Sequence, residues 1–166
     1  MRVLLILLRQ AVAMNRFGIL VALLCSVAWP DAVRACPDAG AAPAEQHRLT
    51  GRQLWSPKRF QVDAGGQIAL TGCAGSGWGY VRAAPDLQFD LARMGRYRRL
   101  HLRSYADCDT VLLLRDPSGR WFFDDDSGVG RTASLSLADP VDGSYAVWVG
   151  SYRSEGCVAR LTLETF

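Results

Sequence analysis

Apolar and polar residues alternate with a period of two along much of the chain beyond its N-terminal third. The alternation is clearest in residues 87–91, 100–103, 145–149 and 159–164. Successive side chains of a β-strand point to opposite faces, so this period predicts strands with one face on a core and the other in water. Residues 111–114 are instead continuously apolar, which predicts a strand that is covered on both faces.

Turn signals separate these segments and complete the prediction of the fold. They are Ala64-Gly65-Gly66, Asp116-Pro117-Ser118-Gly119, Asp126-Ser127-Gly128 and Asp142-Gly143. No long segment has a helical stripe with caps, and a sheet without helices can bury its apolar face only against another sheet. Residues 48–166 are therefore predicted to be all-β, an antiparallel two-sheet, jelly-roll-like β-sandwich of about eight or nine strands.

Two hairpins are expected within this sandwich. The Asp116-Pro117-Ser118-Gly119 turn joins residues 111–115 to 121–123, because proline presets φ at the second position of a β-turn. Residues 145–150 and 157–164 form the second expected hairpin, joined by the short segment between them.

The first 35 residues resemble a secretory signal peptide. Met14-Asn15-Arg16 provides a positive start, residues 17–29 an apolar run, and Val33-Arg34-Ala35 a cleavage pattern before Cys36. The run is shorter than the ~20 residues that span a membrane. Translation from Met1 with a long signal and translation from Met14 both fit, and we favour Met14. We expect removal of residues 1–35, an N-terminal arm at 36–47, and a secreted or periplasmic location.

Four cysteines remain after this cleavage: Cys36, Cys73, Cys108 and Cys157. An even number in an exported chain indicates two disulfides, for which four cysteines allow three pairings. We favour Cys36–Cys73 and Cys108–Cys157, because Cys108 precedes the buried strand and Cys157 lies at the loop end of the last hairpin. The alternative of Cys36 as a lipidated cysteine is disfavoured by Arg34, which stands where lipoprotein signals carry a small or apolar residue.

The net charge of +3 belongs to the expected signal, which holds four arginines and one aspartate. The remaining chain carries 15 basic and 15 acidic residues, so the basic pI of the whole chain is no argument for nucleic acid or an anionic membrane as a partner. A group of four arginines, Arg96, Arg98, Arg99 and Arg103, is interpreted as a solvated strand face, because aspartates lie nearby in the sequence.

Three motifs in the C-terminal half resemble the bacterial pre-peptidase C-terminal domain family. They are residues 107–119 (DCDTVLLLRDPSG), residues 121–127 (WFFDDDS) and residues 143–152 (GSYAVWVGSY). The resemblance covers about residues 86–166. It implies a jelly-roll-like β-sandwich that is exported from bacteria, often attached to secreted peptidases, and that aids secretion or binds calcium or a substrate polymer. The four cysteines are additional to the family's pattern.

The residues do not indicate a catalytic site. His47 lies in the expected arm, and His101 alternates outward on an expected strand. Ser76 stands between two glycines, but Ala74 occupies the position of the first glycine of a G-x-S-x-G elbow. We therefore expect no enzymatic activity, and a peptidase label would follow from family association alone.

Two other groups are candidates for binding. Asp124, Asp125 and Asp126 form a candidate calcium site, because calcium prefers hard oxygen ligands, although aspartates also cap turns. Trp148 and Tyr152 form a candidate ligand platform if the outer face of their strand is uncovered. The sequence thus predicts a non-catalytic accessory or binding module for an extracellular protein or polysaccharide; the alternative is a peptidase-associated protein without a recognisable triad.

Overall fold

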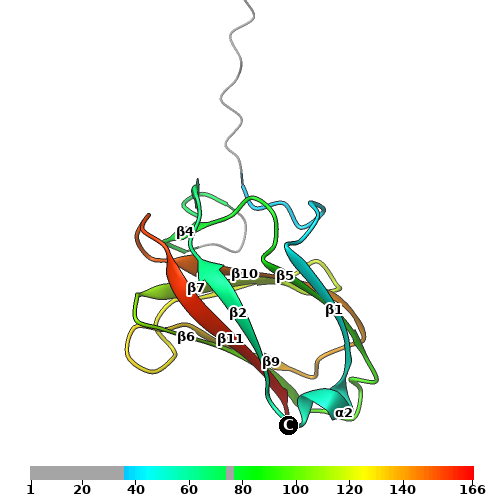
Figure 1. The fold of residues 1–166 in the computed structure, drawn as a ribbon. Helices are drawn as coiled ribbons and strands as arrows, with labels where there is room; N and C mark the ends of the chain where they lie inside the picture. Colours follow the sequence, from blue (N-terminus) through cyan, green and yellow to red (C-terminus); the bar gives the residue numbers. More distant parts are fainter. Residues whose placement is uncertain (1–35, 74–76) are drawn as a thin grey trace, which may run out of the picture. The chain divides into compact units, whose positions relative to one another are not determined.

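The computed structural model describes residues 36–73 and 77–166. The expected signal peptide and Ser76 lie outside these residues. The chain divides into two units, residues 1–34 and 35–166, and the description below concerns the second of them (Figure 1). Within the described residues, no helix is long and apolar enough to cross a membrane.

Strands make up nearly all of the regular structure, so the prediction of an all-β sandwich is confirmed. The described residues form β1 (Glu45–Thr50), α2 (Gly51–Leu54), β2 (Lys58–Ala64), β3 (Ile68–Ala69), β4 (Tyr80–Val81), β5 (Leu87–Ala92), β6 (Arg99–Ala106), β7 (Thr110–Arg115), β8 (Trp121–Asp124), β9 (Ser134–Ala138), β10 (Gly143–Ser151) and β11 (Cys157–Thr165). The number of strands exceeds the eight or nine expected, mainly because two very short strands, β3 and β4, of two residues each, are added.

The strands form a seven-stranded and a four-stranded sheet. In the first, β10 pairs with β5 and β4 along one edge and with β7 along the other, β1 lies beyond β5, β3 beyond β4, and β8 beyond β7. The second has the order β2-β11-β6-β9. The pairing is antiparallel except that β1 runs parallel to β5. The expected boundary of the arm at residue 47 therefore falls inside a paired strand.

Of the two expected hairpins, one is confirmed and one is wrong. Strands β7 and β8 pair directly, with Arg115 opposite Trp121, and the side chain of Asp116 accepts the N–H groups of Ser118 and Arg120 in the turn. Strands β10 and β11 belong to different sheets. Each of them has partners on both of its edges, so neither has an edge left for the other, and the segment between them crosses from one layer to the next.

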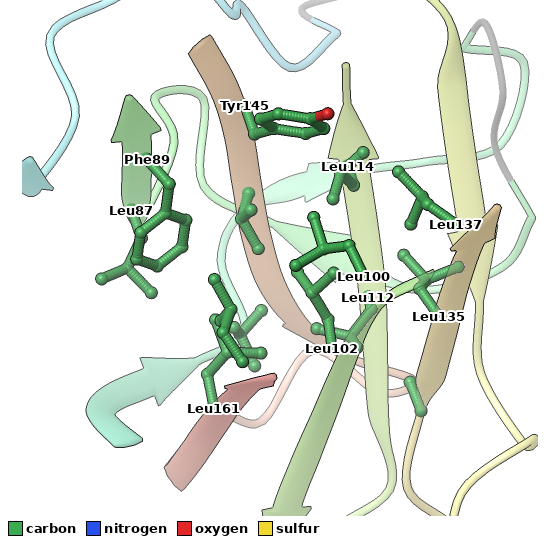
Figure 2. Close-up of a cluster of buried hydrophobic side chains, with 14 of the residues drawn as sticks. Leu87, Phe89, Leu100, Leu102, Leu112, Leu114, Leu135, Leu137, Tyr145 and Leu161 are labelled. Carbon is green, nitrogen blue, oxygen red and sulfur yellow. The ribbon is translucent and has the colours of Figure 1, made fainter. Parts of the chain in front are cut away.

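The main core lies between the two sheets (Figure 2). The seven-stranded sheet contributes Leu87, Phe89, Leu112, Leu114 and Tyr145, and the four-stranded sheet Leu100, Leu102, Leu135, Leu137 and Leu161. These residues are the inward members of the period-two pattern. A smaller cluster lies on the other face of the seven-stranded sheet, where Val111 and Leu113 pack with Leu70, Val81 and Trp148. Residues 111–114 are therefore covered on both faces, as their continuous apolar sequence predicted.

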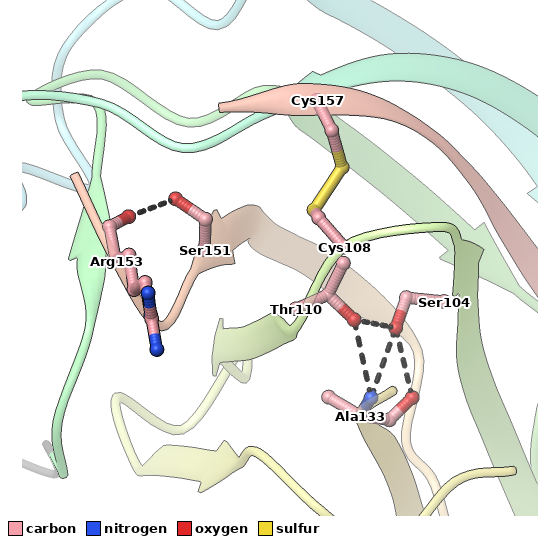
Figure 3. The surroundings of a disulfide bond; sticks show 7 residues. All are labelled: Ser104, Cys108, Thr110, Ala133, Ser151, Arg153 and Cys157. Carbon is pink, nitrogen blue, oxygen red and sulfur yellow. Dashed lines mark hydrogen bonds between the residues drawn. A yellow bond between two sulfur atoms is a disulfide. The ribbon is translucent and has the colours of Figure 1, made fainter. Parts of the chain in front are cut away.

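Both favoured disulfides are present. Cys36–Cys73 joins the N-terminal arm to the segment after β3, and Cys108–Cys157 joins the β6–β7 connection to the start of β11 (Figure 3). Beside the second disulfide, the Ser104 and Thr110 hydroxyls lie 2.6 Å apart and both accept the Ala133 N–H. The loop-closure entropy removed by separations of 37 and 49 residues corresponds to roughly 4 kcal/mol for each disulfide.

A buried carboxyl group occupies the point where β10 changes partners along one edge. Asp86 Oδ2 accepts the N–H of Val149 at 2.8 Å, between the positions where β10 pairs with β5 and with β4. Burial raises the pKa of Asp86 to about 6, although the bond from Val149 and the nearby Arg82 act in the opposite direction. The native state therefore binds the Asp86 proton more tightly than the unfolded chain does.

This pKa predicts a pH dependence of stability. The pKa of Asp86 in the folded protein lies above its value of about 3.9 in the unfolded chain. The free energy of unfolding therefore falls by about 3 kcal/mol as pH rises from about 4 to 6 and Asp86 ionises. Asp86→Asn keeps an oxygen acceptor for Val149 and removes the charge. We expect the variant to unfold at higher urea concentration than the wild type at pH 7.5 and at a similar concentration at pH 4. A stability difference that does not change with pH would contradict this assignment.

Candidate functional site

The outer face of the four-stranded sheet carries the polar half of the period-two pattern. Its residues, named here the polar face, are Arg59, Gln61 and Asp63 of β2; Val158, Arg160, Thr162 and Glu164 of β11; Arg99, His101, Arg103 and Tyr105 of β6; and Ser134, Ser136 and Ala138 of β9. Pairing in register brings them into rows across the strands, such as Gln61–Arg160–Tyr105 and Arg59–Thr162–Arg103–Ser134.

A groove of about 710 Å³ lies at one end of the polar face. It is lined by Arg59, Phe60, Gln61, Tyr105, Ala106, Asp107, Val129, Thr132, Val158, Ala159 and Arg160. The Arg160 guanidinium lies 5.2 Å from the centre of the Tyr105 ring, a cation–π arrangement that leaves its N–H edges available. Val129 and Val158 are 82% and 61% exposed, so the groove presents apolar surface beside hydrogen-bonding groups.

On the polar face, a serine, a histidine and a glutamate from three different strands also lie side by side. Ser134 Oγ lies 2.7 Å from His101 Nε2, and Glu164 Oε1 lies 3.8 Å from His101 Nδ1. Burial lowers the pKa of His101, as does the charge of Arg103, while Glu164 acts in the opposite direction. Sequence reasoning missed this contact, because these residues meet only through the pairing of β6 with both β9 and β11.

Several features distinguish this arrangement from a catalytic triad. The Glu164 oxygen that faces His101 is bonded to Arg103, and 3.8 Å is too long for a hydrogen bond. Ser134 donates its own backbone N–H to Asp124, and it is not among the residues that line the groove at the end of the polar face. Acyl transfer needs a nucleophile beside donors that stabilise an oxyanion.

We therefore expect Ser134 to be unreactive. Incubation of the purified protein with a fluorophosphonate probe should leave its intact mass unchanged, because Glu164 is bonded to Arg103 and lies too far from His101 to complete a triad with Ser134. Heat-denatured protein provides the control for nonspecific labelling. A probe adduct on Ser134 that is lost in His101→Ala would contradict this expectation and support a hydrolase.

The aspartates of the candidate calcium site follow β8. Asp124 is engaged within the fold, since its carboxylate accepts the Ser127 N–H at 3.1 Å, the Ser134 N–H at 2.7 Å and the Ser127 hydroxyl. The pKa of Asp125 is raised by burial and then by the charges of Asp126, Asp124 and Asp109. In the part of the chain that the structure describes, no group of three or more histidines, cysteines or carboxylates is arranged to hold a metal ion.

Calcium binding can be measured through melting temperature. A cation that binds the folded state raises the melting temperature. Aspartates that only cap turns leave the melting temperature unchanged when calcium is added. Because Asp124 already accepts three hydrogen bonds, we expect melting curves in excess calcium and in chelator to coincide. A rise in melting temperature with calcium that disappears in Asp125→Asn, and persists in Asp38→Asn, which changes an aspartate outside the candidate site, would instead establish the site.

The condition for the candidate platform of Trp148 and Tyr152, an uncovered outer face, is not met at Trp148. Trp148 has no exposed surface, whereas Tyr152 is 44% exposed. The Trp148 ring centre lies 5.4 Å from that of Trp121, and the tryptophan packs in the small cluster with Leu70 and Val81. The outer face of β10 is thus covered by β8 and by the β3–β4 segment, which are separate in sequence, so period-two alternation could not reveal the cover.

No family model and no curated protein matches the chain. Among solved structures it is similar to the pre-peptidase C-terminal domain of collagenase from Bacillus anthracis, with 13% identity, a TM-score of 0.45, and coverage of 75% of this chain and 99% of that one. It is also similar to Aeromonas hydrophila PliG, a periplasmic inhibitor of g-type lysozyme, with 10% identity, a TM-score of 0.43, and coverage of 74% and 98%. A structure from the family that the sequence motifs resemble is therefore among those similar to this chain.

Proposed function

We propose that this chain is an exported, non-catalytic binding module that holds an acidic extracellular polysaccharide in the groove of its polar face. The observation that carries the proposal is the pair of Arg160 and Tyr105, stacked at 5.2 Å inside an open groove of about 710 Å³. The two disulfides support an oxidising compartment outside the cytosol.

The chemistry of the groove suits a sugar chain. The rings of a polysaccharide present apolar faces and hydroxyl edges, which match aromatic and aliphatic surface beside donors and acceptors. Tyr105, Val129 and Val158 supply the apolar surface, and Gln61 and Thr132 supply polar groups.

The charges of the groove favour an acidic sugar. Arg59 and Arg160 line it together with one carboxylate, that of Asp107. Neither arginine forms an ion pair with a carboxylate in the described residues. Planar guanidinium groups bind carboxylates through paired N–H donors, so each arginine is free to bind a uronate group of the polymer.

The test is affinity electrophoresis through gels that contain alginate, polygalacturonate or neutral dextran. We expect retardation by an acidic polymer, none by dextran, and a loss of retardation as salt rises, because the ion pairs are exposed. Arg160→Gln should weaken binding roughly ten-fold through loss of a charge-assisted hydrogen bond.

A matched control exists on the other sheet. Arg115 lies 5.9 Å from the centre of the Trp121 ring, so Arg115→Gln also removes a guanidinium from above an aromatic ring, but outside the groove. We expect this variant to bind as the wild type does. Equal binding by Arg160→Gln and Arg115→Gln, or wild-type mobility that no acidic polymer alters, would contradict the proposal.

A further inference from the structure

A second pocket, of about 540 Å³, lies where the β5–β6 connection passes α2. It is lined by Thr50, Arg52, Arg93, Gly95, Arg96 and Tyr97, which include no residue of the polar face. Its arginines come from two separate segments of the chain, α2 and the connection between β5 and β6. Sequence reasoning placed Arg96 on a solvated strand face, but the structure places it in this connection.

The three arginines of this pocket have no ionic partners among residues 36–73 and 77–166. In the described residues, no carboxylate lies within 4.0 Å of the guanidinium nitrogens of Arg52, Arg93 or Arg96. Asp142 contacts the same connection, but its Oδ1 accepts the backbone N–H of Met94 at 2.6 Å and so holds the main chain. Three like charges around one pocket repel one another, and a bound anion relieves that repulsion.

The main chain around the pocket is held in place before any ligand arrives. Arg93 has a φ of 59°, a conformation that non-glycine residues adopt when their surroundings impose it, and the Asp142–Met94 bond follows directly. On the other side, Thr50 and Gln53 form a reciprocal capping box at the start of α2. Ordering the site therefore costs little beyond fixing the arginine side chains.

Gly51 sets the position of the aromatic wall. A Cβ at residue 51 would lie 2.3 Å from the Tyr97 ring, so the absence of a side chain lets that ring rest against α2. The ring centre of Trp55 lies 6.2 Å from that of Tyr97, and Trp55 is 65% exposed. An exposed tryptophan beside a fixed tyrosine offers an apolar surface at the edge of the arginine pocket.

We infer that this pocket binds the phosphate monoester group of a sugar phosphate, with the sugar ring against Tyr97 and Trp55. A phosphate monoester carries a charge of about −1.5 to −2 near pH 7, which matches three guanidinium groups better than the single negative charge of a carboxylate does. Arginine binds phosphate oxygens through paired N–H donors. The site is separate from the groove of the polar face and does not depend on the proposed function.

The test is isothermal titration of the whole purified protein, at constant ionic strength, with glucose 6-phosphate, inorganic phosphate and glucose. We expect glucose 6-phosphate to bind more tightly than inorganic phosphate, because only the ester brings a ring to Trp55, and glucose not to bind. Arg52→Gln and Arg96→Gln should each weaken binding of both phosphates roughly ten-fold. Trp55→Ala should weaken the binding of glucose 6-phosphate but not that of inorganic phosphate.

Two variants serve as controls. Arg98→Gln removes an exposed arginine from the same connection, one that pairs with Asp139 and does not line the pocket. Arg160→Gln tests independence from the polar face. Both should bind glucose 6-phosphate as the wild type does, whatever they do to polysaccharide binding.

Three outcomes would overturn the inference. One is equal loss of affinity in Arg96→Gln and Arg98→Gln, which would indicate general attraction by surface charge. Another is the absence of measurable binding of glucose 6-phosphate to the folded wild type. The third is binding to vesicles that contain phosphatidic acid without binding to glucose 6-phosphate, which would assign the phosphate to a lipid headgroup.

Discussion

The covering of β10 on both of its faces is the constraint on which the rest of the structure depends. One face packs in the main core through Tyr145, Val147 and Val149, and the other packs in the smaller cluster through Ala146 and Trp148. Strands on both edges satisfy its backbone, with Asp86 completing the ladder where the partner changes. The seven-stranded sheet therefore has little open surface around its centre. The four-stranded sheet keeps one polar face, and this asymmetry places the candidate groove there.

The sequence predicted those features that depend on neighbours along the chain. Alternation identified the inward residues of β5, β6, β10 and β11, and the Asp116-Pro117-Ser118-Gly119 turn identified the β7–β8 hairpin. The continuous apolar run of β7 indicated two covered faces, which the two clusters confirm. In each case the physical cause is local, either the pleat of one strand or the conformational preference of one turn.

The failures have a common physical origin in long-range pairing. Strands β10 and β11 have the patterns of a hairpin, but each is satisfied on both edges by strands that lie elsewhere in the sequence. Trp148 occupies an outward position in the period-two pattern of its strand, but Trp121 and the β3–β4 segment cover it. The contact of His101 with Ser134 requires the register of β6 and β9, which no local pattern encodes. Alternation thus determines which residues lie on the same face of a strand. Whether other segments cover that face depends on the topology.

Equal numbers of acidic and basic residues in residues 36–166 do not give an evenly neutral surface. Four aspartates, Asp86, Asp116, Asp124 and Asp142, accept backbone N–H groups, so their charges are localised at turns and at a break in a strand pair. In the described part of the chain several arginines form no ion pair, among them Arg52, Arg93 and Arg96 of the second pocket and Arg59 and Arg160 of the polar face. Turns and the break in strand pairing therefore hold these four carboxylates in place, while these five arginines stay available at the surface of the described residues to meet an anion.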